Sequence, residues 1–222
     1  MLACAIMAIR DEKKQQTRQA LLEAAIDQVA GGRSFASLSL REVTRDAGVV
    51  PASFYRHFRD MDELGLALVD ETCQQLRRLI RAARTTQAPG DNMLAASVST
   101  FLLYVEANRP AFHFLTRERY GGSKPLREAI AREIRGFVVD LAADFARFPH
   151  FNQLPRDDLE MMASLLVNTV VSALGELLEL PPHHPDAKGA LAQHLTDQMR
   201  VVILGALAWK PGTRVPTTTS AA

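Results

Sequence analysis

The segment Ser39–Leu64 constrains the fold more than any other part of the sequence, because helix start and stop signals follow one another there at short spacing. Ser39 and Glu42 form a capping box, which starts a helix at the next residue after the serine. Gly48 supplies the left-handed residue that ends this helix. Pro51 suits the first position of a second, short helix. The segment therefore predicts two short helices joined by a Gly-centred turn.

The second short helix has one apolar and one polar face. Phe54 and Phe58 lie four residues apart and are expected to point into a core. Asp60 and Glu63 form a second capping box, which predicts a long third helix. Two short helices around such a turn form a helix-turn-helix, whose second member enters the DNA major groove. The residues that we expect to contact DNA are Arg41, Pro51, Ala52, Ser53, Tyr55, Arg56, His57 and Arg59.

These residues also carry a family resemblance. The words Arg-Asp-Ala-Gly-Val, Phe-Tyr-Arg-His-Phe and Asp-Glu-Leu resemble the DNA-binding domain of the TetR family of transcriptional repressors, over residues 13–85. Longer words such as Ser-Phe-Tyr-Arg-His-Phe-Arg-Asp resemble its FabR and DesT branch, which represses unsaturated fatty acid synthesis and desaturation; this likeness extends to about residue 208. The resemblance implies a homodimer on a palindromic double-stranded operator, controlled by a hydrophobic small molecule, in this branch a long-chain acyl-CoA.

Two positions depart from the family pattern. Val50 stands where the family often has Ser or Thr, and Met61 stands where it tends to have Lys. Neither side chain can donate a hydrogen bond to a phosphate. We therefore expect Arg41, Tyr55 and Arg59 to anchor the phosphates instead.

The composition permits DNA binding without predicting it, because the 222 residues carry a formal net charge of only +1. Cys4 and Cys73 lack metal-ligand spacing and fit a reducing cytoplasm. The apolar start, Met1 to Ile9, is too short for a signal peptide, and Met7 is an alternative start of the protein. No run of about eighteen purely apolar residues occurs, so we expect a cytoplasmic protein without membrane insertion.

Helical apolar stripes recur along the chain and strand-like alternation does not, which predicts an all-α fold of about nine helices. We expect a DNA-binding domain at residues 11–60, an effector-binding and dimerisation domain at 61–209 linked through the helix 61–84, and a disordered tail at 210–222. Further predicted helices cover residues 11–30, 93–107, 124–148, 157–180 and 187–209, with a short helix from Arg109 and a polar loop at 116–124.

The helix predicted at 157–180 is apolar nearly all round, so it needs cover on two sides. A partner subunit is the simplest source of that cover. We expect this helix and the helix at 187–209 to pair with their copies as a four-helix dimer interface.

Aromatic and methionine side chains of the larger domain form either a filled core or an apolar pocket, and the residues alone favour the core. The branch resemblance favours an acyl tunnel, which flexible Met and flat rings can line. Cations around Gly121-Gly122, including Lys124 and Arg127, would hold the head group; ordinary pairing with Glu118 and Glu128 is the alternative. The expected ligand-binding residues are Phe101, Tyr104, Phe112, Phe114, Arg117, Arg119, Phe137, Met161 and Met162.

Other chemistry finds little support. His183 and His184 are adjacent in a Pro-rich loop, unlike a helical metal-chelating pair, and no third ligand is evident. No Gly-rich phosphate loop or nucleophile elbow occurs, so we expect no metal, no cofactor and no enzyme. Besides an acyl-CoA-controlled repressor, the sequence leaves a drug-responsive repressor, a lipid carrier that does not bind DNA, and an adaptor acting through its dimer helices.

Overall fold

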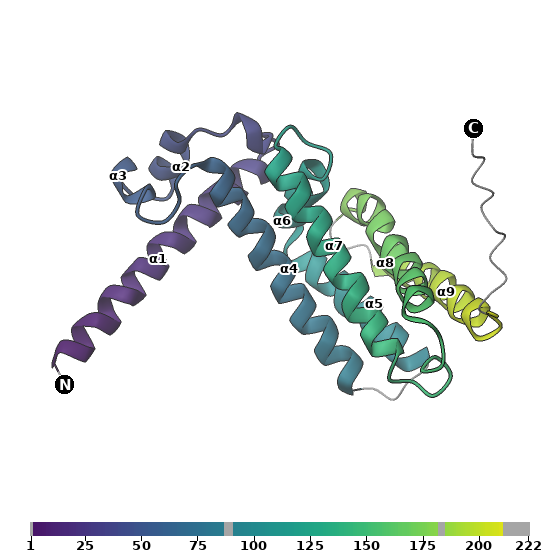
Figure 1. Ribbon diagram of the computed structural model, residues 1–222. Coiled ribbons are helices and arrows are strands. Elements are labelled where there is room, and N and C mark those ends of the chain that lie inside the picture. The colour runs from purple at the N-terminus through teal and green to yellow at the C-terminus, as the bar shows by residue number, and fades with distance from the viewer. Residues whose placement is uncertain (1, 87–90, 182–184, 211–222) are drawn as a thin grey trace, which may run out of the picture. The chain divides into compact units, whose positions relative to one another are not determined.

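The computed structural model describes residues 2–86, 91–181 and 185–210, which are almost entirely helical (Figure 1). Within these ranges there are nine α-helices and no strand, which confirms the predicted all-α fold. The elements are α1 (Leu2–Ala30), the 3₁₀ turn η1 (Phe35–Ser37), α2 (Leu40–Asp46), α3 (Pro51–Phe54), α4 (Met61–Thr86), α5 (Asp91–Ala107), α6 (Arg109–Glu118), α7 (Lys124–Phe145), α8 (Arg156–Glu179) and α9 (Pro185–Leu207).

Three predicted boundaries were wrong by several residues, while those of α4, α8 and α9 differ by only one or two. Helix α1 begins at Leu2 rather than at residue 11, because the apolar start has no Gly or Pro to interrupt a helix. The loop predicted at 116–124 is shorter, since α6 continues to Glu118 and α7 begins at Lys124. Helix α7 ends at Phe145, and tight turns precede the proline that was expected to stop it. The predicted tail lies outside the described residues, apart from residue 210.

The chain packs as two units. One contains the chain up to Arg81 together with Thr100–Glu133, and the other contains Ala82–Ser99 together with the chain from Ile134. The first unit therefore includes α6 and the first half of α7 as well as the helix-turn-helix. The functional division proposed at residues 60 and 61 is a separate matter and stays a prediction.

In the first unit, α1 packs against both α2 and α6. Leu21 and Ala25 of α1, Val43 of α2, Phe54 of α3 and Leu64 of α4 are fully buried. A charged contact also joins two of these helices. Arg18 of α1 forms a salt bridge with Glu71 of α4, and its guanidinium lies 5.4 Å from the ring centroid of Phe58.

In the second unit, α8 and α9 pack against each other (Figure 1). Just beyond the end of α9, the indole of Trp209 donates a 3.1 Å hydrogen bond to the buried carboxylate of Asp158 in α8. By length and composition alone α8 could cross a membrane, with a mean hydropathy of 1.6 over its most apolar window. The search for an unbroken apolar run in the sequence did not detect this apolar helix. A helix that is covered on two sides by other helices of a soluble protein is equally apolar.

Candidate nucleic-acid interface

The start of α2 is held by the predicted capping box and by an arginine that the sequence reasoning missed. The Glu42 amide donates to Ser39 Oγ at 3.3 Å, and the Ser39 amide donates to Glu42 Oε2 at 3.2 Å. Arg33 reaches both oxygens of Glu42 at 3.1 Å and donates to the Ser37 carbonyl at 2.9 Å. The hydrogen bond from Arg33 and those from Ser39 lower the pKa of Glu42 to about 2. The carboxylate therefore stays ionised and fixes α2 relative to the preceding turn.

The turn between α2 and α3 follows the prediction. Gly48 has φ +67°, the left-handed conformation expected after α2. Pro51 occupies the first turn of α3. Helix α3 is shorter than expected, because it ends at Phe54 and Tyr55 to His57 continue as a turn. Phe54 is fully buried and Phe58 nearly so, which confirms their role as anchors.

The buried rings leave a polar surface outside. Tyr55 is 65% exposed, and Arg41 and Arg56 are exposed as well. Among the described residues, none forms a hydrogen bond or ion pair with these three side chains. Pro51 and Ala52 are also exposed and small enough to let the backbone approach a polar surface, while Ser53 is half-buried. Arg41, Ser53, Tyr55, Arg56 and Arg59 are all predicted to contact DNA, and after that prediction we call them the DNA-facing surface.

Arg59 differs from the other arginines of this surface. Its guanidinium lies 3.0 Å from Glu63, which raises the pKa of Arg59, and its backbone amide donates to the same carboxylate at 2.7 Å. The second capping box is therefore only half formed: Asp60 accepts from the Glu63 amide at 2.8 Å, while Glu63 caps Arg59 instead of Asp60. A phosphate would have to share Arg59 with Glu63.

His57 is a half-buried group of the motif. Burial lowers the pKa of its imidazole, and the positive charges of Lys14, Arg18 and Arg56 lower it further. Its Nδ1 is buried and has no hydrogen-bond partner among the described residues. His57 is thus largely neutral at pH 7, and a nearby phosphate would favour its protonation.

The predicted ligand-binding residues divide between the two units. In the first unit Phe101, Tyr104 and Phe112 form a ring cluster, with the centroid of Phe112 6.4 Å from Phe101 and 5.8 Å from Tyr104. Phe114 instead meets Phe35, outside this cluster. In the second unit Met162 is buried, Met161 is 40% exposed and Phe137 is half-buried.

The cations expected around Gly121-Gly122 have local partners. Arg127 donates to both glycine carbonyls, Lys124 lies 3.7 Å from Glu128, and the Arg119 guanidinium lies 5.3 Å from the Tyr120 ring centroid. Arg117 is exposed. Glu118, which the alternative interpretation pairs with these cations, is only 4% exposed, and burial, then the charge of Asp62, raises its pKa.

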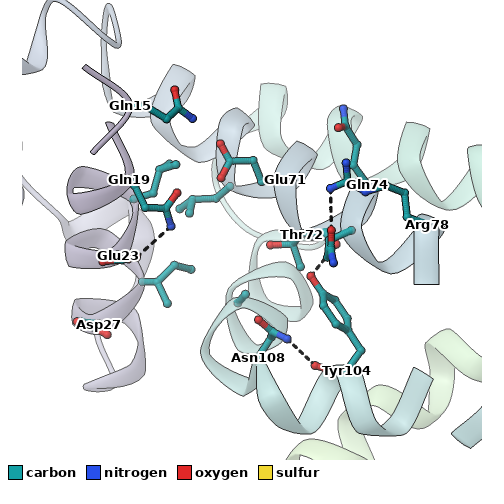
Figure 2. Close-up of a pocket in the computed structure, with 15 residues that line it drawn as sticks. Gln15, Gln19, Glu23, Asp27, Glu71, Thr72, Gln74, Arg78, Tyr104 and Asn108 are labelled. Atoms are coloured by element: carbon teal, nitrogen blue, oxygen red, sulfur yellow. Dashed lines mark hydrogen bonds between the residues drawn. The ribbon is translucent and has the colours of Figure 1, made fainter. Parts of the chain in front are cut away.

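A polar groove of about 870 Å³ opens in the first unit between α1, α4 and the α5–α6 junction (Figure 2). Tyr104 donates to the Thr72 carbonyl at 3.3 Å, and Asn108 donates to the Tyr104 carbonyl at 2.8 Å. Carboxylates outnumber cations in its lining, since Glu23, Asp27 and Glu71 face one arginine, Arg78. Such a groove disfavours the phosphates of CoA, and of the predicted ligand-binding residues Tyr104 alone lines it.

In the part of the chain that the structure describes, no three His, Cys, Asp or Glu side chains lie close enough together to bind a metal ion. His183 and His184 lie outside that part. Cys73 is buried, and burial raises the pKa of its thiol to about 12. The thiol therefore stays protonated.

Comparison with known proteins covers both halves of the chain. Residues 21–68 match the bacterial regulatory proteins of the tetR family, and residues 90–202 match the tetracyclin repressor-like C-terminal domain. Similar solved structures include a regulator from Rhodococcus sp. (23% identity, TM-score 0.65, covering 85% of this chain and 98% of that one). Another, from Syntrophomonas wolfei, has 13% identity and a TM-score of 0.71, covering 85% and 96%.

A third similar structure is the transcriptional regulator FadR from Bacillus subtilis in complex with stearoyl-CoA. It is 14% identical to this chain, with a TM-score of 0.63 over 82% of this chain and 96% of that one. At such identities these three structures establish a common fold.

Proposed function

The chain belongs to the TetR family of DNA-binding transcriptional regulators, and from that premise we propose that it represses fatty acid synthesis or desaturation genes under the control of long-chain acyl-CoA. As a member of this family it is a regulator and not an enzyme. The proposed part concerns its target genes, its effector and its assembly.

The observation that carries the DNA contact is that Tyr55 and Arg56, beside a tightly capped α2, are exposed and have no hydrogen-bond or ion-pair partner among the described residues. Arginine and tyrosine side chains in this state can bind phosphates or base edges without first breaking a hydrogen bond or ion pair to another described residue. We propose that the DNA-facing surface, together with Pro51, Ala52 and His57, forms the operator contact. Domains at residues 11–60 and 61–209 would then carry DNA binding and effector response.

Homodimerisation is supported by apolar side chains left exposed in the second unit. Leu165 of α8 is 52% exposed, and Val201, Leu204 and Leu207 of α9 are 69%, 58% and 51% exposed. We call these four residues the α8–α9 surface. Burying a side chain of this size contributes about 1.5–3 kcal/mol, so a second copy would stabilise the surface substantially. A two-fold dimer would present two recognition helices to a palindromic operator about one DNA turn apart.

The acyl-CoA part rests on the sequence resemblance to the FabR and DesT branch and on the stearoyl-CoA complex of a protein with this fold. A kinked unsaturated chain and a straight saturated one would pack aromatic rings differently. Only such a difference in interaction can shift a DNA-binding equilibrium.

The test is a titration of the complex between this protein and its own upstream DNA. Palmitoyl-CoA and oleoyl-CoA should change the operator affinity by different amounts, while free CoA should leave it unchanged. Equal effects from both would remove the claim that saturation is sensed. Release by a cationic dye, without a response to either acyl-CoA, would support the second candidate, a drug-responsive regulator, which the acid-rich groove in the first unit favours.

A further inference from the structure

Phe35, in the short link between α1 and α2, is packed against a helix far from it in sequence. Its side chain is 4% exposed. The ring of Phe114 in α6 meets it edge-on, with centroids 5.0 Å apart and an interplanar angle of 62°. This is a favourable arrangement for two aromatic rings. The DNA-binding motif thus contacts α6 directly through one buried ring pair.

Gly65 makes room for Phe35 inside α4. A Cβ atom at this position would lie 2.9 Å from the ring of Phe35 and 2.9 Å from Cδ2 of Leu126 in α7. Glycine in a helix interior costs about 1 kcal/mol relative to alanine. The close approach of Phe35 and the fully buried Leu126 offsets that cost. Helices α4, α6 and α7 therefore form a socket around Phe35, built by Gly65, Phe114 and Leu126.

The link that carries Phe35 is rigidly joined to α2. Arg33 donates to the carbonyl of Ser37 at the end of η1 and also binds Glu42 in the first turn of α2. Leu38, which follows η1, is buried. A displacement of Phe35 would therefore move the start of α2, because the segment between them cannot easily absorb it.

The socket is also tied to α4 from the other side. In the turn between α6 and α7, the hydroxyl of Ser123 donates to Asp62 of α4 at 3.0 Å. Arg127 of α7 holds the carbonyls of Gly121 and Gly122 in the same turn. The α6–α7 turn, residues 118–127, and the base of the helix-turn-helix are therefore one packed cluster.

We infer that Phe35 is a positioning residue that couples the α6–α7 turn to the orientation of the helix-turn-helix. Packed interfaces rearrange between discrete states rather than deforming continuously, so a shift of α6 or α7 would move Phe35 and α2 together. The further step, in which a bound effector shifts α6 or α7, rests on the proposed function. Coupling between two sites is reciprocal, so DNA bound at the motif must also act on the α6–α7 turn.

The test uses that reciprocity and needs no effector. Hydrogen exchange of residues 118–127 is measured in the full-length protein with and without operator DNA, for the wild type and for Phe35→Leu. Operator binding should slow exchange of this segment in the wild type by about fivefold or more, a typical size of coupling between sites. Phe35→Leu should still bind the operator and should lose most of that slowing.

The matched control is Phe145→Leu, a similarly buried phenylalanine of the second unit that packs against Phe148 and Phe151. It should keep the wild-type response, which separates loss of coupling from general loss of packing. Phe35→Met, which preserves volume but not the ring, replaces Phe35→Leu if that variant fails to fold.

The outcomes are distinguishable. A wild type that binds no operator would contradict the proposed DNA contact. Operator binding without any change at residues 118–127, or a full response in the Phe35 variant, would overturn the coupling and leave the proposed function standing.

Discussion

The DNA-facing surface and the α8–α9 surface are both exposed, but they expose opposite chemistry. The first presents arginines, a tyrosine and a serine around short helices whose phenylalanine rings are buried. The second presents leucine and valine on two long helices. Cationic and hydrogen-bonding side chains suit an anionic polymer such as DNA, whereas exposed apolar side chains are stabilised when they are buried. The contrast predicts that salt and surface charge act on the two surfaces in different ways.

The largest effect is expected from placing a charge on the α8–α9 surface. Leu204→Glu would bury an unpaired carboxylate in the dimer, at a cost of about 3 kcal/mol or more, so self-association should weaken at least ~100-fold. Sedimentation velocity at micromolar concentration measures this. Leu103→Glu, at an exposed leucine of the first unit, is the control and should remain dimeric. A monomeric wild type would sink the proposed interface.

Removing side chains from the DNA-facing surface should have the next largest effect. Tyr55→Ala and Arg56→Ala should each weaken operator binding by about 1–3 kcal/mol. A phosphate contact would weaken binding to operator and random DNA alike and would flatten the salt dependence, whereas a base contact would relax specificity.

Affinities for operator and for random DNA, measured across a salt series, distinguish a phosphate contact from a base contact. Arg45→Ala is the control, because Arg45 is exposed but pairs with Asp46 at 3.0 Å. If both test variants match the control within about twofold, the contact assignment is wrong.

A smaller effect compares two glycines. Gly48→Ala should destabilise the protein by about 1–2 kcal/mol, because φ +67° is strained for a residue with a Cβ. Gly189→Ala in α9 meets open space at a helical position, so it should stabilise by up to about 1 kcal/mol. Thermal unfolding of both variants should therefore shift in opposite directions. Equal shifts would mean that the turn does not depend on the left-handed residue.

The smallest effect concerns pH. In the free protein burial, then the charges of Lys14, Arg18 and Arg56, lower the pKa of His57, so its imidazole is mostly neutral at pH 7. Operator phosphates near it would raise that pKa, so operator affinity should rise as the pH falls. Operator affinity should rise by at most about tenfold for each unit by which bound DNA raises the pKa of His57.

Operator affinity between pH 5 and 8, compared with His57→Gln, isolates this contribution. Equal pH slopes for the two proteins would mean that His57 does not face the phosphates.

The helix-turn-helix was predictable because its signals are local. The Ser39–Glu42 cap and the turn at Gly48 depend on residues within a few positions, and the structure has both. Gly65 was missed, because its need for a small residue comes from Phe35 and Leu126, which are distant in sequence. Glu118 was considered only as a pairing partner for nearby cations, and its burial was missed because nothing in its neighbourhood along the chain predicts it.

The predicted ligand-binding residues were only partly brought together, because their contacts also depend on residues distant in sequence. Aromatic spacing identified the ring cluster of Phe101, Tyr104 and Phe112, but helical periodicity cannot separate a core ring from a pocket wall. Phe114 is as deeply buried as Phe112, but its ring contacts Phe35 of the DNA-binding motif instead.

Trp209, held by its hydrogen bond to Asp158, is an intrinsic fluorescence probe of the second unit. Trp209 is the single tryptophan of the chain, and its indole is bound to a buried carboxylate at the beginning of α8. With excitation selective for tryptophan, the intrinsic emission of the protein therefore originates at one point of the second unit. A change in this emission on dilution would report dissociation of the α8–α9 surface, and one on adding operator would report a signal that has travelled from the first unit to the second.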